Sequence, residues 1–341
     1  MKVIQIRKRA MSNLIELINE NHKIAIIAHV NPDGDSVSSI LALGLALKKM
    51  NKEVEIILND SLPGKFSFLP GKEYLVAFDD RKNTQFDICF VLDCGSKSRV
   101  KNGEELFAIS SNIINIDHHV SNDYFGDINI VDLEASSTSE IIYNVIENDL
   151  EVKIDKDIAT CLHTGLMSDT GNFTYVNATS RTFYIASKLL EQGVDIENIS
   201  YHLHQSKSLN SVKLLGNVLE SIEFYLDNRL AIISYTDKQL LKYNATYLDT
   251  DGMINYARDI KGVEVAITLY EFEKNKVKIS ARSKKHFDVN NLVNQFNGGG
   301  HVKAAGAVIS GNLDEVKVKL KEAVKKSFEI NKLTQISGEM N

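Results

Sequence analysis

The chain has 341 residues, of which 43% are apolar and 25% are charged, and its formal net charge is −6. These are the values of a folded globular protein, so they exclude a disordered or collagen-like chain. The length predicts two domains. Three cysteines (Cys89, Cys94 and Cys161) are too few for a disulfide framework and favour a reducing, cytoplasmic setting. No apolar run approaches the roughly 20 residues of a membrane span, so we expect neither a signal peptide nor a membrane partner.

The charge is unevenly divided along the chain. Residues 1–220 hold 21 basic and 30 acidic side chains, whereas residues 221–341 hold 18 basic and 15 acidic ones. This pattern suits an acidic, metal-binding domain beside a mildly basic domain that holds an anion, although acidic surfaces also serve solvation alone. Neither part has the strong basic patch that tight binding of long duplex nucleic acid requires.

Strand-like and helix-like segments alternate over the first two hundred residues. Apolar strands are predicted at residues 23–29, 53–58, 86–92 and 112–116. Helices are predicted at residues 36–50, 137–148, 155–168 and 180–192, the first of them capped by Asp35 and Ser36. The alternation predicts an α/β fold with a mostly parallel sheet covered by helices on both faces.

The pattern changes near residue 205. A linker helix is predicted at residues 206–220, followed by strand pairs at 222–226 with 230–235 and at 263–271 with 276–282. A helix at 289–296 leads into a glycine cluster, and a second helix is predicted at 313–330. We therefore expect a catalytic domain at 1–205, a smaller C-terminal α/β domain at 221–330, and a loose tail at 331–341.

Aspartate and histidine residues follow three of the predicted strands and one helix. They are His29, Asp33 and Asp35 after the first strand, Asp93 after the third, Asp117, His118 and His119 at the end of the fourth, and Asp169 after the helix at 155–168. Because ligands bind beyond the carboxyl ends of the strands in an open α/β sheet, we expect these side chains to meet at one edge. So much negative charge in one place is unfavourable unless cations neutralise it.

The chemistry that fits this cluster is a pair of divalent ions. Two-metal hydrolases hold their ions roughly 3.5–4 Å apart around a bridging hydroxide that attacks phosphorus. The oxygen and imidazole ligands for such a site would be His29, Asp33, Asp35, Asp93, His118 and Asp169. A mixture of imidazole and carboxylate ligands suits Mn²⁺, with Mg²⁺ and Co²⁺ as alternatives.

Each of these segments also has an ordinary structural interpretation. Residues 33–35 are typical of a turn with a helix cap, Asp93 can simply end a strand, and residues 169–171 form a common turn sequence. The triplet at 117–119 is harder to explain in this way. The metal site is the better hypothesis because all four segments end at the same predicted edge of the sheet.

A glycine cluster forms a second constellation. Gly298, Gly299 and Gly300 precede His301, and three glycines allow the backbone to approach an anion with its amide groups. The cluster follows a helix and lacks the spacing of a Rossmann or P-loop motif. Arg282 and Ser283, at the end of a predicted strand, offer a bidentate grip on a phosphate. A flexible loop and an ordinary surface arginine are the alternatives.

Taken together, these segments resemble the DHH phosphoesterase superfamily. The triplet Asp117-His118-His119 names that family, and residues 298–306 resemble the DHH-associated domain found C-terminally in the same proteins. Length, order and spacing are most similar to the NrnA-like group, which are bifunctional oligoribonucleases that also dephosphorylate 3′-phosphoadenosine 5′-phosphate (pAp). The resemblance extends from roughly residue 10 to residue 328.

The resemblance implies a role for each residue. One ion would be held by His29, Asp33 and Asp93, and the other by Asp35, Asp93, His118 and Asp169, with Asp93 as the bridge. Asp117 would orient a ligand imidazole, and His119 would face the substrate phosphate as a general acid. The terminal phosphate of the nucleotide would be bound by Arg282 and His301, with Ser283 and the three glycines beside them.

The function implied is a Mn²⁺-dependent phosphoesterase that hydrolyses short oligoribonucleotides to mononucleotides and converts pAp to AMP. The second domain would act as a ruler, holding one end of the substrate while the ions act on the other. Two alternatives stay open, namely a DHH phosphodiesterase of linear or cyclic dinucleotide signals and a catalytically inactive nucleotide-binding protein. A DHH pyrophosphatase and a long-strand exonuclease fit the sequence less well, and a homodimer is one option for the assembly.

Overall fold

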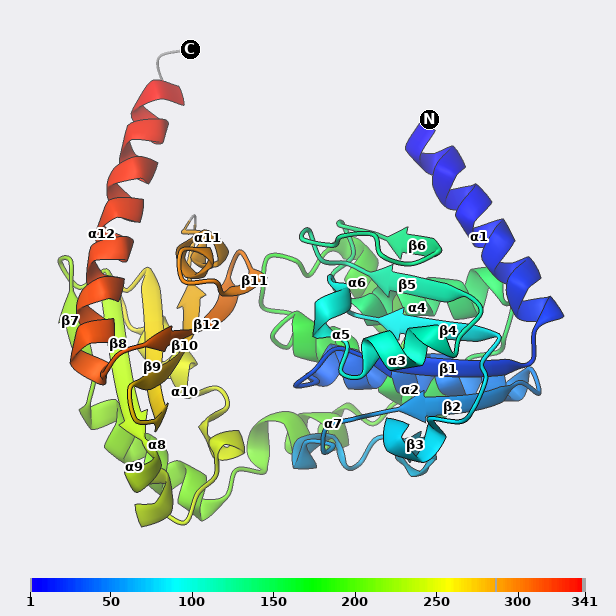
Figure 1. Cartoon of the computed structure of the whole chain (residues 1–341), viewed down its shortest axis with the longest axis horizontal. Helices are drawn as coiled ribbons and strands as arrows, with labels where there is room; N and C mark the ends of the chain where they lie inside the picture. Colours follow the sequence, from blue (N-terminus) through cyan, green and yellow to red (C-terminus); the bar gives the residue numbers. More distant parts are fainter. Residues whose placement is uncertain (1, 286, 339–341) are drawn as a thin grey trace. The chain divides into compact units, whose positions relative to one another are not determined.

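The computed structural model describes residues 2–285 and 287–338, with side chains at 11–285, 287–300 and 302–329. The chain divides into two compact units, residues 1–206 and 207–341. Each unit is built on its own six-stranded sheet (Figure 1). None of the helices in the described part combines the length and the apolarity that a bilayer crossing requires.

The sheet of the first unit is parallel throughout and has the strand order β3-β2-β1-β4-β5-β6. Its strands are β1 (Lys23–Ala28), β2 (Glu53–Ile57), β3 (Leu75–Val76), β4 (Ile88–Leu92), β5 (Ile113–Asp117) and β6 (Ile128–Val131). The predicted α/β fold with a parallel sheet is confirmed. The edge strands β3 and β6 were not predicted, since each has at most four residues and little apolar alternation.

Helices cover both faces of this sheet. They are α1 (Lys2–Glu20), α2 (Gly34–Lys49), α3 (Gly103–Ala108), α4 (Thr138–Asn144), α5 (Lys156–Asp169), α6 (Ser180–Leu190) and α7 (Ile196–Ser200). Helices α1, α2, α4, α5 and α6 share one large apolar core with the sheet, and α3 covers a smaller core on the other face. The central strand β4 is buried at every residue, as a strand between two helical layers must be.

The start of α2 differs from the prediction. The helix begins at Gly34 and its N-cap is Asp33, whose carboxylate accepts a hydrogen bond from the Ser36 amide at 3.1 Å. The Ser36 hydroxyl accepts in return from the Asp33 amide at 2.8 Å, which completes a capping box. The predicted caps, Asp35 and Ser36, were therefore wrong. Asp35 does not cap its own helix because its carboxylate points to the first amides of α4.

The second unit has a mixed sheet with the strand order β11-β12-β10-β9-β8-β7. Its strands are β7 (Glu223–Tyr225), β8 (Leu230–Thr236), β9 (Val265–Glu273), β10 (Lys276–Ser283), β11 (Gly299–His301) and β12 (Ala304–Ser310). Both predicted hairpin pairs are confirmed as antiparallel, while β8 and β9 run parallel. The glycine cluster, treated in the sequence as a loop, enters a further hairpin of β11 with β12.

Helices also cover both faces of the second sheet. They are α8 (Leu209–Glu220), α9 (Asp237–Lys242), α10 (Met253–Asp259), α11 (Val289–Asn294) and α12 (Leu313–Gly338). Helices α11 and α12 pack on one face, and α8, α9 and α10 pack on the other. Helix α12 continues to Gly338, through most of the segment that was expected to be loose. Short helical turns complete the chain at η1 (Gly64–Phe66), η2 (Lys72–Tyr74), η3 (Phe78–Arg81), η4 (Lys97–Arg99), η5 (Val145–Asp149), η6 (Tyr201–Gln205) and η7 (Tyr247–Thr250).

Candidate metal centre

Three neighbouring strands of the first sheet end at the same edge and carry the predicted ligands there. His29 follows β1, Asp93 follows β4, and His118 follows β5, and these strands pair side by side in that order. Asp33, the N-cap of α2, and Asp35, in its first turn, lie at the same edge. Helix α5, which packs against α2, contributes its last residue, Asp169. The six side chains form what we call the candidate metal cluster: His29, Asp33, Asp35, Asp93, His118 and Asp169.

Asp93 lies at the centre of this cluster. Its Oδ2 is 3.6 Å from Nε2 of His29, and its Oδ1 is 3.6 Å from Nε2 of His118. On one side, Nε2 of His29 is 4.0 Å from a carboxylate oxygen of Asp33. On the other side, Nε2 of His118 is 3.5 Å from a carboxylate oxygen of Asp169. One carboxylate thus stands between two groups of potential ligands, as the bridge of a two-ion site must.

The donor atoms converge in three overlapping groups. Within each group the ligand atoms all lie within 4.8 Å of one another, and the groups are His29 with Asp33 and Asp93, Asp35 with His118 and Asp169, and Asp93 with His118 and His119. The first group is the ligand set predicted for one ion, and the second contains three of the four residues predicted for the other, without Asp93. The third group shows that the geometry also lets His119 take part in metal binding.

The backbone of Asp93 adopts a left-handed conformation, with φ of 54°. Such a conformation costs a non-glycine residue roughly 1–3 kcal/mol and is concentrated at functional sites. The Asp93 amide donates to the carbonyl oxygen of Ile116 at 3.0 Å, which continues the β4–β5 ladder up to this residue. The sheet therefore holds the turn in place, with the carboxylate between the two imidazoles.

The N-terminus of α4 anchors two of the carboxylates. Asp35 accepts hydrogen bonds from the amides of Thr138 at 2.6 Å and Ser139 at 2.9 Å, where the helix dipole favours negative charge. The hydroxyl of Thr138 donates to Oδ1 of Asp93 at 3.0 Å. Sequence reasoning missed Thr138, although the run of small hydroxyl residues at 136–139 was a signal for such a role.

A buried glutamate braces the same segment. Glu140 has no exposed surface and accepts hydrogen bonds from the amide and hydroxyl of Ser136, at 3.3 and 2.6 Å, and from the Thr182 hydroxyl at 2.9 Å. Arg181 pairs with Glu140 and, at 3.2 Å, with Asp132. This network was not predicted, because its partners are about forty residues apart in the sequence.

Asp117 holds His119. Its Oδ1 accepts from Nδ1 of His119 at 2.6 Å, and its Oδ2 accepts from the side-chain amide (Nδ2) of Asn122 at 2.6 Å. Nδ1 of His118 instead faces the carbonyl oxygen of Ala135 at 3.3 Å. Asp117 is thus hydrogen-bonded to His119, the expected general acid, and the Nδ1 contact of the expected ligand His118 is to the backbone. The hydrogen bond to Asp117 fixes the orientation of the His119 ring.

The electrostatics of the cluster are those of a site that needs cations. Burial and the neighbouring charge of Asp93 raise the pKa of Asp35 to about 7. Burial and the charge of Asp35 raise the pKa of Asp169 well above its usual value. Burial alone would lower the pKa of His29, but its hydrogen bond to Asp93 and the charge of Asp33 outweigh burial and raise it to about 9. Without metal ions, protons bound to these side chains neutralise the negative charge of the carboxylates. Divalent ions would neutralise the same charge, so the donor atoms and their charge fit a pair of such ions.

Two family profiles match the chain. Residues 23–166 match the DHH family, N-terminal domain, and residues 231–327 match the DHHA1 domain. The chain belongs to the DHH phosphoesterase family.

Proteins similar to this DHH chain extend over both of its units. The Thermus thermophilus bifunctional oligoribonuclease and PAP phosphatase NrnA is 32% identical over 306 residues, which are 89% of this chain and 90% of the relative. The cyclic-di-AMP phosphodiesterase PdeA of Listeria monocytogenes is 28% identical over 326 residues, which are 89% of this chain but 47% of PdeA. The crystal structure of an exopolyphosphatase-related protein from Bacteroides fragilis has a TM-score of 0.86 at 30% identity, with 96% of this chain and 97% of that one covered.

In the DHHA1 domain, the predicted phosphate-binding residues differ in their surroundings. Arg282 is half-buried on β10, in register with Ala304 of β12. The Ser283 side chain is buried, and its hydroxyl donates to the carbonyl oxygen of Phe287 at 2.6 Å. That hydroxyl is therefore engaged inside its own domain, which favours a supporting role for Ser283. The side chain of His301 lies outside the part of the chain that the structure describes.

The three glycines also separate into two kinds. A Cβ at Gly298 would lie 2.4 Å from the carbonyl oxygen of Gly306, and one at Gly300 would lie 2.5 Å from that of Ala304. These two glycines are required by the packing of the β11–β12 hairpin. A Cβ at Gly299 would have no heavy atom within 4 Å among the described residues, so Gly299 alone presents an open backbone.

Proposed function

We propose that this chain is a Mn²⁺-dependent phosphoesterase that hydrolyses short oligoribonucleotides to mononucleotides and dephosphorylates pAp to AMP. The observation that carries the proposal is the position of Asp93 between His29 and His118, with both imidazoles 3.6 Å from its two oxygens. The similarity to a bifunctional oligoribonuclease and PAP phosphatase over 90% of that relative's length supports the choice of substrates.

The candidate metal cluster is the proposed ligand set. His29 and Asp33 would serve one ion, Asp35, His118 and Asp169 would serve the other, and Asp93 would serve both. The ions would activate water and neutralise charge on the phosphoryl oxygens. Two imidazoles among the six ligands favour Mn²⁺ over Mg²⁺, and Co²⁺ is an alternative. Thr138, through its hydrogen bond to Asp93, would keep that carboxylate in its bridging orientation.

His119 is the proposed general acid. The hydrogen bond from its Nδ1 to the buried Asp117 fixes the orientation of the ring, and its Nε2 would protonate the leaving oxygen. Burial alone would lower the pKa of His119, but the bond to Asp117 and the charge of Asp93 outweigh burial and raise it. The higher pKa favours the protonated imidazole, which is the form that a general acid needs before the reaction.

The DHHA1 domain would bind the far phosphate of the substrate, remote from the bond that is cut. Arg282 would supply the cation, His301 a second donor, and Gly299 the open backbone amide. A contact with a second phosphate would favour pAp and short 5′-phosphorylated RNA as substrates. The chain would work in the cytoplasm, a placement that its three free and buried cysteines support.

A phosphodiesterase of linear or cyclic dinucleotide signals is the second candidate. The observation in its favour is the 28% identity to the cyclic-di-AMP phosphodiesterase PdeA. The match covers 47% of PdeA, whereas it covers 90% of the oligoribonuclease relative, so we place this candidate second.

The experiment that decides between these functions is a comparison of initial rates. The chelator-treated chain is supplied with Mn²⁺ and equal amounts of pAp, a 5′-phosphorylated RNA dinucleotide, a long RNA strand and a cyclic dinucleotide. We expect the first two to be hydrolysed fastest. A cyclic dinucleotide as the best substrate would replace the proposal with the second candidate, and no turnover of any substrate would favour an inactive nucleotide-binding protein.

A further inference from the structure

Three tyrosines of the DHHA1 domain form a stack of rings. Tyr270, on β9, lies in the middle, with its ring centre 4.9 Å from that of Tyr235 on β8 and 5.3 Å from that of Tyr247 in η7. The neighbouring rings are tilted by only 21° and 18°. Tyr235 is buried at one end of the stack, whereas Tyr247 is 38% exposed at the other. The stack therefore ends in an aromatic ring that Tyr270 supports on one face and that is partly open to solvent.

A lysine accompanies the exposed ring. Nζ of Lys278 lies 4.4 Å from the centre of the Tyr247 ring, and Lys278 is in register with Tyr270 on the neighbouring strand. The hydroxyl of Tyr270 donates a hydrogen bond to Asp237. This bond engages the carboxylate of Asp237 and holds the middle ring in place, so the exposed ring rests on a fixed support.

One face of the sheet connects this stack with Arg282. Along β10, Lys278, Ser280 and Arg282 are partly exposed and alternate with residues of the core. On the neighbouring strand β12, Val308 is paired with Lys278 and is 55% exposed. Because side chains alternate between the two faces of a strand, Lys278 and Arg282 share a face and are about 13 Å apart, four residues along the strand. That separation is too long for both cations to bind the same phosphate group.

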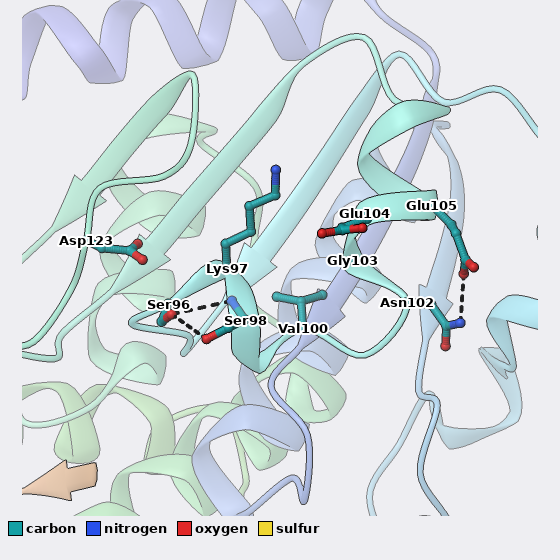
Figure 2. Close-up of a pocket in the computed structure, with 9 residues that line it drawn as sticks. All are labelled: Ser96, Lys97, Ser98, Val100, Asn102, Gly103, Glu104, Glu105 and Asp123. Carbon is teal, nitrogen blue, oxygen red and sulfur yellow. Dashed lines mark hydrogen bonds between the residues drawn. The ribbon is translucent and has the colours of Figure 1, made fainter. Parts of the chain in front are cut away.

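The hollow shown in Figure 2 has the opposite character. It lies on the DHH domain, has a volume of about 650 Å³, and has Lys97, Glu104, Glu105 and Asp123 as its charged lining residues. With three carboxylates and one ammonium group, it bears a net negative charge and would repel an oligonucleotide. Aromatic rings beside a cation, as in the tyrosine stack, are instead the composition of sites for single-stranded nucleic acid.

We propose that Tyr247 and Lys278 bind a nucleotide of single-stranded RNA beyond the phosphate that Arg282 holds. The base would stack on the exposed Tyr247 ring, a contact that every base can make because each has an aromatic face. The flexible stem of Lys278 lets its ammonium group move from the ring to the phosphate of the same nucleotide. This inference rests on the proposed function insofar as the substrate is RNA. With one base and two phosphates, which the metal cluster and Arg282 would take, pAp does not reach the stack.

The test uses a 5′-phosphorylated RNA of five nucleotides with 2-aminopurine at each position in turn, because the fluorescence of this base falls when it stacks on an aromatic ring. Binding to the chelator-treated chain gives the affinity for intact RNA, and initial rates with Mn²⁺ give KM for the RNA and for pAp. The variants are Tyr247→Ala, Tyr247→Phe and Lys278→Ala. Tyr256→Ala is the matched control. Tyr256 is 45% exposed in the same domain and has Nζ of Lys207 5.3 Å from its ring centre, but it is not part of the stack.

Tyr247→Ala should weaken RNA binding and raise the KM for RNA by on the order of 10-fold, the effect of losing one stacked base. Lys278→Ala should weaken binding by a smaller factor, because its phosphate contact is at an exposed position. Tyr247→Phe should retain most of the affinity, Tyr256→Ala should match the unmodified chain, and the KM for pAp should be unchanged in every variant.

RNA affinities of Tyr247→Ala and Lys278→Ala equal to that of Tyr256→Ala overturn the inference. An equal loss on pAp also overturns it, because the substitutions would then damage the domain as a whole. The same holds if the unmodified chain does not bind the RNA, or if 2-aminopurine is quenched at no position. If the RNA is bound and quenched but not hydrolysed, the proposed function fails while the stacking site is confirmed.

Discussion

The pair formed by Asp117 and His119 offers the sharpest test of the proposed chemistry. We predict that Asp117→Asn keeps the fold and the metals but impairs the general acid. An asparagine has the same volume and its amide oxygen can still accept from Asn122, which donates to Asp117 at 2.6 Å. Its amide group would then face Nδ1 of His119 as a donor, so the imidazole would be pushed toward the neutral form.

The magnitude follows from the geometry of that bond. The two side chains are 2.6 Å apart and almost fully buried, so their charge-assisted hydrogen bond contributes roughly 1.5–3 kcal/mol. Because the variant loses this contact, the pKa of His119 should fall. A general acid is active when protonated, and its activity is lost as the pH rises through its pKa. The alkaline limb of the kcat profile should therefore move to lower pH, and kcat on this limb should fall by on the order of 10- to 100-fold, the equivalent of the lost contact.

The assay is the pH dependence of kcat for two substrates that differ in leaving group. With pAp, the ribose hydroxyl that leaves needs a proton, so Asp117→Asn should be impaired. With bis-p-nitrophenyl phosphate, the leaving group needs no proton, so the variant should be close to normal. Asp123→Asn is the matched control, because it removes a charge from the same loop at an exposed position.

Two outcomes would refute this reasoning. An unchanged pH profile with pAp would show that Asp117 does not set the protonation of His119. An equal loss on both substrates, together with weaker Mn²⁺ binding, would show that His119 is a metal ligand, which the convergence of Asp93, His118 and His119 within 4.8 Å permits.

The remaining predictions concern the DHHA1 domain and acid stability. Arg282→Ala should lower kcat/KM on pAp by on the order of 10- to 100-fold and leave bis-p-nitrophenyl phosphate unaffected; a uniform loss would contradict the role in binding a far phosphate. Gly299→Val should unfold at the same temperature as the unmodified chain but bind pAp poorly. Gly300→Val should lower the melting temperature, because its Cβ would meet the β12 backbone. Equal melting temperatures for the two variants would contradict the different roles of these glycines. Burial lowers the pKa of His163 from 6.5 to about 4, so the stability it contributes is complete above pH 6.5 and is lost as the pH falls toward 4. The free energy of unfolding falls between pH 7 and pH 4.5, and His163→Leu should make that fall smaller by roughly 2–3 kcal/mol. Urea unfolding at both pH values measures it. The same fall in the variant and the unmodified chain would contradict the role given to His163.

The strand ends were predictable because the signals are local. Apolar runs of five or six residues predict buried strands, and an aspartate or histidine directly after such a run must lie at the sheet edge. That reasoning brought His29, Asp93 and His118 together correctly, since β1, β4 and β5 are neighbours in the sheet. In a parallel sheet, the carboxyl ends of all strands lie at the same edge. The order of the strands in the chain and the right-handed connections between them therefore indicate which ends are neighbours.

The supporting contacts were not predictable, because they join distant segments. Nothing near Asp35 in the sequence shows that its carboxylate accepts hydrogen bonds from another helix. The donors are the amides of Thr138 and Ser139, more than one hundred residues away. Glu140 is similar, since a glutamate in an amphipathic helix is expected at the surface, and its burial depends on Arg181 of α6. The β11–β12 hairpin was missed for a different reason, because glycine and alanine carry little strand signal.

The central claim is that Asp93 bridges two ions in one site, and the direct measurement is a calorimetric titration of Mn²⁺ into the chelator-treated chain and its Asp93→Ala variant. We predict two ions per chain for the unmodified protein. For Asp93→Ala we predict one ion at most, with turnover lowered on the order of a thousandfold or more. Two ions still bound in Asp93→Ala, or a single ion bound by the unmodified chain, would contradict the account.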